Sequence, residues 1–137
     1  MDDTLDDVFV AQLMSTDVHS VRPDTLVEEA AATLQDNEIG SVVVVDDSGH
    51  LQGILTTTDF VDIVAKSHPK AETAVSRYMT TDVMTTGAEV SIRDVADMMI
   101  EHGFHHMPVL DGDSVIGMIT STDLAAYVSH VQTSSPS

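Results

Sequence analysis

The chain contains the same sequence pattern twice. Residues 13–18 (LMSTDV) return as residues 78–83 (YMTTDV), and residues 53–60 (GILTTTDF) return as residues 117–124 (GMITSTDL). A duplicated unit of this length does not easily bury a core of its own, but two copies packed about a pseudo-twofold axis do. The seam between two such copies supplies clefts of nearly equal shape, where small ligands often bind. The repeat therefore predicts one compact pair of similar halves.

Each half is predicted to fold as a helix, two strands and a second helix. Apolar residues at the spacing i, i+3, i+4, i+7 mark the first helix. Runs of β-branched or apolar residues, followed by Asp and Gly, mark two strands joined by a turn. The expected elements are helices 27–37 and 91–102, strands 41–45, 51–56, 107–110 and 115–120, and a closing helix that follows the last strand of each half. This mixture predicts an α/β (α+β) fold.

Three local features refine this prediction. Pro108 has no N–H to donate to a β ladder, so its strand is expected to start at a sheet edge or at a bulge. Residues 3–14 are expected to form a helix that leads into the first half. The polar segment around Pro69 is the clearest linker, because proline ends the preceding helix.

These signals predict four segments along the chain. The N-terminal helix and the first repeat are expected in residues 1–67, the linker in 68–75 and the second repeat in 76–131. Residues 132–137, which are rich in Ser, are expected to be a disordered tail.

The charge balance restricts the partners. The chain has 23 acidic and 5 basic residues, a formal net charge of −18, so it is expected to bind neither nucleic acid nor an anionic membrane. The excess of acid serves solubility or, as we favour, adaptation to a cytoplasm at molar salt, as in a halophilic archaeon, where the Debye length is only about 3 Å. No apolar run approaches the roughly 20 residues of a membrane span. A cytoplasmic location is expected.

The motif Gly-x-x-Thr-x-x-Asp occurs at Gly53–Asp59 and again at Gly117–Asp123, at each predicted strand-to-helix junction. A Thr followed three positions later by an acid is typical of a capping box, which satisfies backbone N–H groups at a helix start. The same carboxylate has acceptors spaced for the vicinal hydroxyls of a ribose. The glycine allows a close backbone approach or marks a bulge. The sequence leaves both pairs of alternatives open.

The order of the motifs resembles a known family. Met-[Ser/Thr]-x-x-Val, an amphipathic helix, a hydrophobic run ending in Pro-Val-x-Asp and Gly-x-[Ile/Val]-[Thr/Ser]-x-x-Asp-[Leu/Phe] together look like the cystathionine beta-synthase (CBS) domain. Two such domains in tandem resemble a Bateman module, and the resemblance covers about residues 10–131. The second copy fits better, since the first has Val43 where the second has Pro108.

The resemblance implies a β-α-β-β-α unit in each half and an adenosine ligand in one or both clefts. In this family the Asp of the last motif holds the ribose, and adenine lies against the segment that follows Met-[Ser/Thr]-x-x-Val. The implied ligand-binding residues are Thr56, Asp59, Thr120, Asp123, Val18, His19, Val21, Val83, Met84, Thr85, His105, His106 and Pro108.

One position departs from the family pattern. Nucleotide-sensing members have a His-Arg pair before the Leu-Pro-Val strand, whereas this chain has His105-His106 there and Gly40-Ser41 in the first half. The arginine that would hold a phosphate bidentately is therefore absent. His102, His105 and His106 have no acid or cysteine to complete a tetrahedral set, so no metal site is expected.

The sequence thus predicts a regulatory module rather than an enzyme, since no nucleophile, base and orienting group follow one another in a recognisable order. AMP, ADP or ATP is the expected ligand, and no cofactor is required. S-adenosylmethionine is the alternative ligand, and a structural or protein-interaction module without ligand is the alternative function. The resemblance further implies a homodimer, and ligand occupancy is expected to reach an unknown regulated protein through a change of conformation.

Overall fold

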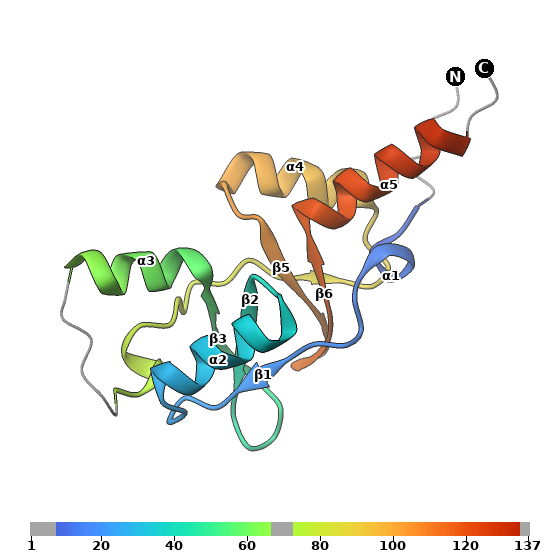
Figure 1. The fold of residues 1–137 in the computed structure, drawn as a ribbon. Coiled ribbons are helices and arrows are strands. Elements are labelled where there is room, and N and C mark those ends of the chain that lie inside the picture. Colours follow the sequence, from blue (N-terminus) through green and yellow to red (C-terminus); the bar gives the residue numbers. More distant parts are fainter. Residues whose placement is uncertain (1–7, 67–72, 135–137) are drawn as a thin grey trace. The chain divides into compact units, whose positions relative to one another are not determined.

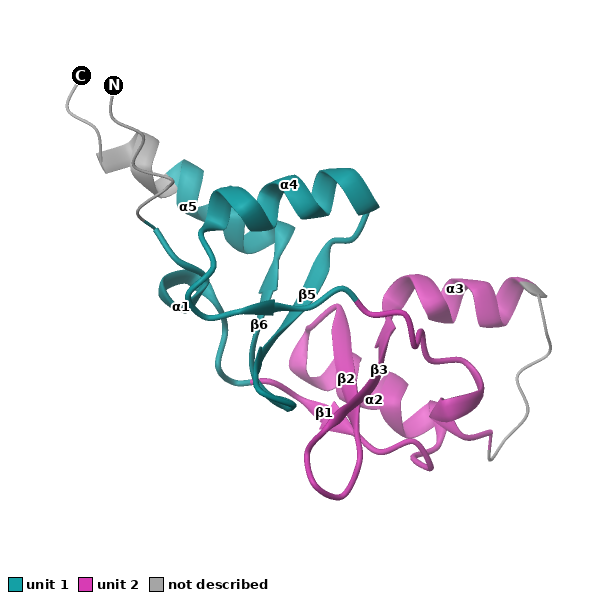
Figure 2. Ribbon diagram, turned by 180° about the vertical axis from the view of Figure 1, so that it is seen from behind, with its two compact units in different colours: residues 1–17, 84–137 teal, residues 18–83 magenta. Residues whose placement is uncertain are grey.

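The computed structural model describes residues 8–66 and 73–134 (Figure 1). The chain forms two compact units, which Figure 2 shows in different colours. Unit 2 is the continuous segment 18–83, and unit 1 combines residues 1–17 with residues 84–137. The compact units therefore divide the chain at different points from the sequence repeats.

Unit 2 is built on a three-stranded sheet in the order β1-β2-β3. Its strands are β1 (Ser20–Val21), β2 (Ser41–Val45) and β3 (Leu51–Thr56), with β1 parallel and β3 antiparallel to β2. Its helices are α2 (Val27–Asn37), α3 (Thr57–Lys66) and the short 3-10 helix η2 (Val75–Arg77). All five residues of β2 are buried. This continuous β-branched strand is covered on both faces, as the sequence predicted.

Unit 1 repeats this arrangement with a sheet in the order β4-β5-β6. Its strands are β4 (Thr86–Gly87), β5 (His106–Asp111) and β6 (Ser114–Thr120), with β4 parallel and β6 antiparallel to β5. Its helices are α1 (Val10–Leu13), α4 (Ile92–His102) and α5 (Ser121–Ser134). The core cluster of this unit joins Val10 of α1 to the apolar faces of α4 and the sheet. The predicted α/β fold with two similar halves is confirmed.

The two equivalent helices α2 and α4 differ in the residues that cap them. Ser91 caps the start of α4 by accepting a hydrogen bond from the backbone N–H of Asp94 (3.2 Å), and Gly103 ends it at φ 75°. The equivalent end of α2 is Glu38, which takes the left-handed conformation with φ 52°. Glycine adopts this conformation without the steric conflict that a Cβ creates, so α2 carries a small strain that α4 avoids.

The prediction for Pro108 was partly wrong. Its strand, β5, is the central strand of the sheet and not an edge. The chain tolerates the missing N–H because β4 is only two residues long and pairs with Val109 and Leu110, so that Pro108 lies just outside the parallel ladder. A shift of register between Val109 and Leu110 supplies the expected bulge. At the matching position of unit 2, Val43 donates its N–H to the carbonyl of His19 (3.2 Å).

The predicted N-terminal helix is shorter than expected. Of the predicted helix 3–14, residues 8–14 are described, and among these only Val10–Leu13 is helical. Residues 3–7 lie outside the described residues. The segment contributes through both backbone and side chains. The N–H of Val10 binds the carbonyl of Val90 (2.9 Å), Ser15 forms a two-bond bridge with Met118, and the Val10 side chain is fully buried in the core of unit 1. These partners pair it with the second repeat and not with the first.

The predicted linker and tail fall partly inside the described residues. Ala74 forms a bridge with Leu26, and the N–H of Val75 binds the carbonyl of Thr25 (2.8 Å), so these residues belong to unit 2. Helix α5 continues to Ser134. Residues 68–72 of the linker and 135–137 of the tail lie outside the described residues.

Candidate ligand sites

In each unit the Thr and Asp of the repeated motif lie where the last strand passes into a helix. In unit 1 the N–H of Thr120 donates to Asp123 Oδ2 (2.8 Å), and the N–H of Asp123 donates to Thr120 Oγ1 (3.1 Å). This is the reciprocal capping box that the spacing predicted. In unit 2 the N–H of Thr56 donates to Asp59 Oδ2 (2.8 Å), and the Thr56 hydroxyl donates to the same oxygen (3.3 Å).

Capping uses only one oxygen of each carboxylate. Among the residues that the structure describes, no hydrogen bond reaches Oδ1 of Asp59 or Asp123, and both side chains are half-buried. An ionised carboxylate offers about four lone-pair sites, so the capping role leaves acceptors for a second group. The two interpretations of the motif, helix cap and hydroxyl-binding site, are therefore compatible.

The two motif glycines serve strand pairing. A Cβ built on Gly53 would lie 2.7 Å from the carbonyl oxygen of Thr80, and one on Gly117 would lie 2.6 Å from Met14 Sδ and 3.0 Å from the carbonyl oxygen of Ser15. Both glycines also lie beside a shift of register. A close backbone approach and a shift of register are thus both present at each glycine, and the approaching backbone belongs to a neighbouring segment of the same unit.

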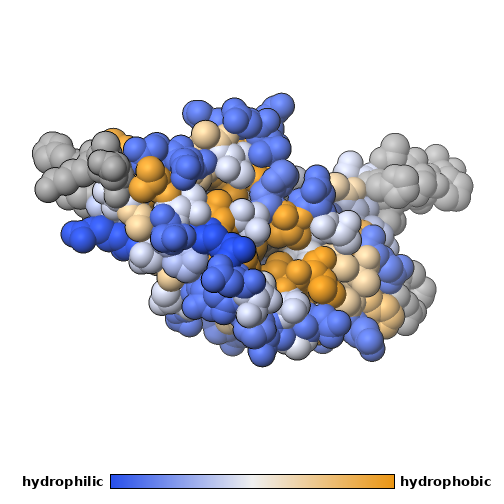
Figure 3. Space-filling view, turned by 90° about the horizontal axis from the view of Figure 1, so that it is seen from below, coloured by the Kyte–Doolittle hydropathy of each residue, from blue (hydrophilic) through white to orange (hydrophobic). Residues whose placement is uncertain are grey.

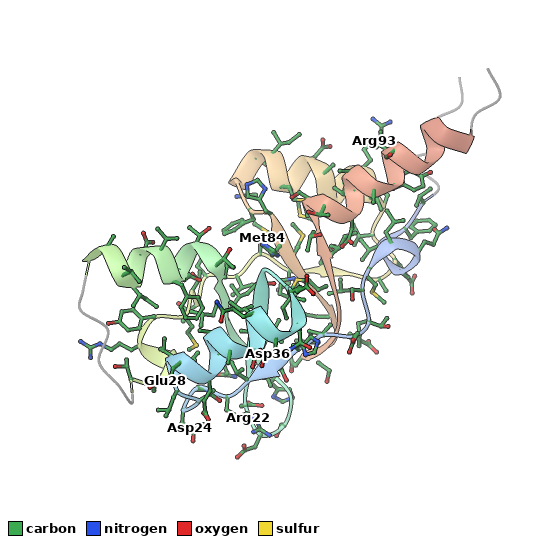
Figure 4. All side chains as sticks on the ribbon, viewed as in Figure 1. Arg22, Asp24, Glu28, Asp36, Met84 and Arg93 are labelled. Atoms are coloured by element: carbon green, nitrogen blue, oxygen red, sulfur yellow. The ribbon has the colours of Figure 1, made fainter. Side chains whose placement is uncertain are left out.

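The segments expected to contact adenine differ in what they expose. In unit 2, His19 is half-buried and its carbonyl binds β2, whereas the side chain of Val21 is packed in the core. In unit 1, Met84, marked in Figure 4, is half-buried and packs against the core, and Thr85 is also half-buried. Val18 and Val83, the first and last residues of unit 2, are half-buried as well. These segments can therefore offer a ligand their backbone groups and the exposed parts of their half-buried side chains.

The histidine pair of unit 1 has two different environments. His105 is exposed, and its carbonyl accepts the N–H of Ser121 (3.0 Å), just as the carbonyl of Gly40 accepts the N–H of Thr57 (3.1 Å) in unit 2. His106 opens β5 directly opposite Thr120. Burial lowers the pKa of His106, the field of His105 lowers it further, and the field of Asp123 acts in the opposite direction. The imidazole of His106 is therefore neutral near pH 7.

Sequence reasoning missed two buried polar residues beside these sites. Ser41 is buried opposite Thr56, at the position that His106 occupies in unit 1. Thr86 is buried opposite Val109, and its hydroxyl has no hydrogen-bond partner among the described residues. The signal for Thr86 was present in the sequence, since Val21 occupies the matching place in unit 2 and is apolar. Pro108, a predicted site residue, is fully buried and exposes no side-chain surface.

His102, which the sequence analysis considered as a metal ligand, and Arg22 both lie at the surface. His102 is close to Glu101 (3.7 Å) and stacks on Phe104, with ring centroids 6.5 Å apart. Arg22, between β1 and α2 and labelled in Figure 4, forms an ion pair with Asp47. Within residues 8–66 and 73–134 no group of three His, Asp or Glu residues is placed to hold a metal ion. No helix in that same part of the chain is long and apolar enough to cross a membrane.

Comparison with known proteins gives the class of this molecule. Residues 10–66 and 75–130 each match the sequence profile of the CBS domain. The chain therefore belongs to the CBS-domain family and carries two copies of the domain.

Relatives of similar length support this assignment. An uncharacterized 17.7 kDa protein of Acidianus ambivalens is 32% identical over 125 residues, which cover 90% of this chain and 75% of that protein. The CBS domain pair of protein MJ0100, solved with 5'-methylthioadenosine and S-adenosyl-L-methionine, is 25% identical with a TM-score of 0.84, over 90% of this chain and 97% of that one. A protein with CBS domains from Burkholderia ambifaria is 29% identical with a TM-score of 0.83, over 95% of this chain and 100% of that one.

Proposed function

We propose that this chain is a regulatory module that binds an adenosine compound at the Thr-Asp motif of each unit. The observation that carries the proposal is Oδ1 of Asp59 and of Asp123, which accepts no hydrogen bond from the described residues and lies at the same strand-to-helix junction in both units. The solved CBS pair of MJ0100, with its two adenosine-containing ligands, supports this class of ligand. In each site the carboxylate would accept hydrogen bonds from the ribose hydroxyls while it continues to cap its helix.

Within this class we propose AMP, ADP or ATP as the ligand, with S-adenosylmethionine as the alternative. The two histidines at the start of β5, His105 and His106, favour a phosphate, whereas the net charge of −18 opposes an anion and favours a sulfonium cation. Salt screens this opposing field. If the ligand is a nucleotide, its affinity should rise as the salt concentration increases from dilute buffer. For S-adenosylmethionine the affinity should fall instead.

The test uses calorimetric titration with AMP, ATP and S-adenosylmethionine on the intact chain and on Asp59→Asn and Asp123→Asn. Asparagine keeps one oxygen for the cap but loses the charge and acceptor sites. Since a hydrogen bond to a charged group contributes about 1.5–3 kcal/mol, each variant should weaken its own site about tenfold to a hundredfold. The melting temperature should change little. Asp94→Asn, an exposed acid in the first turn of α4, is the matched control and should bind normally.

A second candidate function is a protein-interaction module without a ligand. It is favoured by the capping bonds, which explain Asp59 and Asp123 without any bound molecule. In that case the two Asn variants would behave like the control with every adenosine compound.

We also propose that the protein forms a homodimer through its helices, acts on a regulated partner protein and works in a cytoplasm at high salt. Figure 3 shows apolar groups among hydrophilic ones on the face seen from below. Several large apolar side chains of helices are also exposed. They are Val61 and Val64 of α3, Ile100 of α4 and Val128 of α5. Light scattering across a range of protein and salt concentrations tests the dimer, because a monomer at all concentrations would contradict it.

A further inference from the structure

At one matched position the two candidate sites differ by a titratable side chain. In unit 1, His106 lies opposite Thr120 across the antiparallel strands, and in unit 2, Ser41 lies opposite Thr56. Directly opposed residues of an antiparallel pair have their side chains on the same face of the sheet. His106 therefore shares its face with the threonine of the binding motif, and Ser41 does the same in the other unit. The fold accepts either a hydroxyl or an imidazole there.

The protein itself does not use the whole imidazole of His106. Nδ1 is buried and has no hydrogen-bond partner among the described residues. A buried polar atom without a partner is a cost to folding. Because serine occupies the matching position in unit 2 without difficulty, packing does not require a histidine here. No bond within the described part of the chain fixes the tautomer, so either ring nitrogen is able to carry the proton.

Few charged groups act on this imidazole. Asp123 faces it from α5, and His105 lies beside it at the start of the same strand. Strands β4 and β6, which flank β5, have no titratable side chain. Helix α4, which precedes β5, ends in Glu101 and His102, and these two lie close to each other. In the absence of ligand the effects of burial and of His105 exceed that of Asp123, and the pKa of His106 lies below its ordinary value.

A bound anion would reverse this balance. A negative charge close to an imidazole favours its protonated form, and it acts more strongly where the imidazole is partly withdrawn from water. We take the ribose of a phosphate-bearing ligand to be held by Asp123 and its phosphate to lie on the face that His106 shares with Thr120. An uncharged nucleoside or a sulfonium cation would not have this effect.

We propose that the unit 1 site binds a phosphate-bearing adenosine compound together with a proton that passes from solution to His106, whereas the unit 2 site, with Ser41, binds without proton exchange. This inference rests on the proposed function and adds the ligand class and the pH dependence of one site. A buffer acid gives up one proton and becomes its conjugate base, and that proton forms one N–H bond on the imidazole ring. Affinity at this site falls as the pH rises, by up to about tenfold per unit between the pKa values of the free and the bound protein.

The test is calorimetric titration of the intact chain with AMP at pH 7 in two buffers of different ionisation enthalpy. The difference between the two measured heats gives the number of protons taken up. AMP should bind once in each unit, and binding in unit 1 should take up as much as one proton. His106→Ser should abolish the uptake and the pH dependence while AMP still binds through Asp123. Ser41→His should create a second proton-linked site. His102→Ser, an exposed histidine of the same unit, is the control and should behave like the original protein.

The results separate this inference from the proposed function. AMP binding with no proton uptake, or with uptake that persists in His106→Ser, overturns the inference and leaves the proposed function standing. Adenosine, which has no phosphate, should bind without proton uptake, and uptake with adenosine would also overturn it. Failure of every adenosine compound to bind overturns both. Melting curves of His106→Ser, Ser41→His and His102→Ser verify that these variants are folded at the temperature of titration.

Discussion

Replacing Thr86 with valine should stabilise the protein. The Thr86 hydroxyl is buried and has no partner among the described residues, while the residue opposite it, Val109, belongs to the core of unit 1. A buried polar group without a partner costs about 1–3 kcal/mol. Valine has the same shape as threonine and suits a strand equally well, so the substitution removes this cost without creating a cavity.

The free energy of unfolding should rise by about 1–2 kcal/mol, the lower part of the range for a buried polar group without a partner. The lower part applies because the surrounding groups relax around the hydroxyl. For a chain of this size, each kcal/mol raises the melting temperature by about 3–5 °C. Urea unfolding followed by circular dichroism measures the change directly. Val21→Thr, at the matching place in unit 2, is the mirror control and should destabilise by a similar amount.

Two outcomes separate the possible roles of this hydroxyl. If Thr86→Val leaves stability unchanged or lowers it, the hydroxyl has a partner such as a bound water, and the reasoning is refuted. If the variant is more stable but binds adenosine compounds more weakly, the hydroxyl contributes to the ligand site.

Two further pairs of substitutions test the backbone arguments. Gly53→Ala and Gly117→Ala should each destabilise by about 1–3 kcal/mol, a range typical of overpacking. The first should cost more, because its Cβ would meet a backbone carbonyl at 2.7 Å, whereas the shortest contact of the second is with the flexible side chain of Met14; equal melting temperatures would contradict this order. Glu38→Gly should instead stabilise α2 by roughly 0.5–1 kcal/mol, since a glycine removes the left-handed strain at φ 52°. Gly103→Ala, at the matching end of α4, should have the opposite sign in the same thermal assay.

Local patterns predicted most of the elements of this fold. Helix 27–37 and strands 41–45 and 51–56 have the predicted bounds. Each is specified by periodicity or by a β-branched run between turn residues, so no distant contact is needed to recognise it. Periodicity did not show that residue 15 pairs with residue 118, or that residue 54 pairs with residue 80. Such pairing depends on how distant segments meet, which a single sequence does not reveal.

The sites were predictable to a similar degree. The spacing of Thr120 and Asp123 predicted the capping box, because that contact is local. The spacing gave no indication of which carboxylate oxygen would stay unused. The aligned positions of Ser41 and His106 became meaningful only once the register of the strands was known. Val21 and Pro108 were expected at the ligand, yet their side chains are buried, since strand position and not motif position decides what a residue exposes.

The bridges Ser15–Met118 and Ile54–Thr80 have a consequence for inheritance. The opening segment of each repeat forms one bridge with the final strand of the other repeat, so a gene break at a repeat boundary would separate these partners. A single copy, transferred alone, would lose this pairing unless a second chain supplied the same segment.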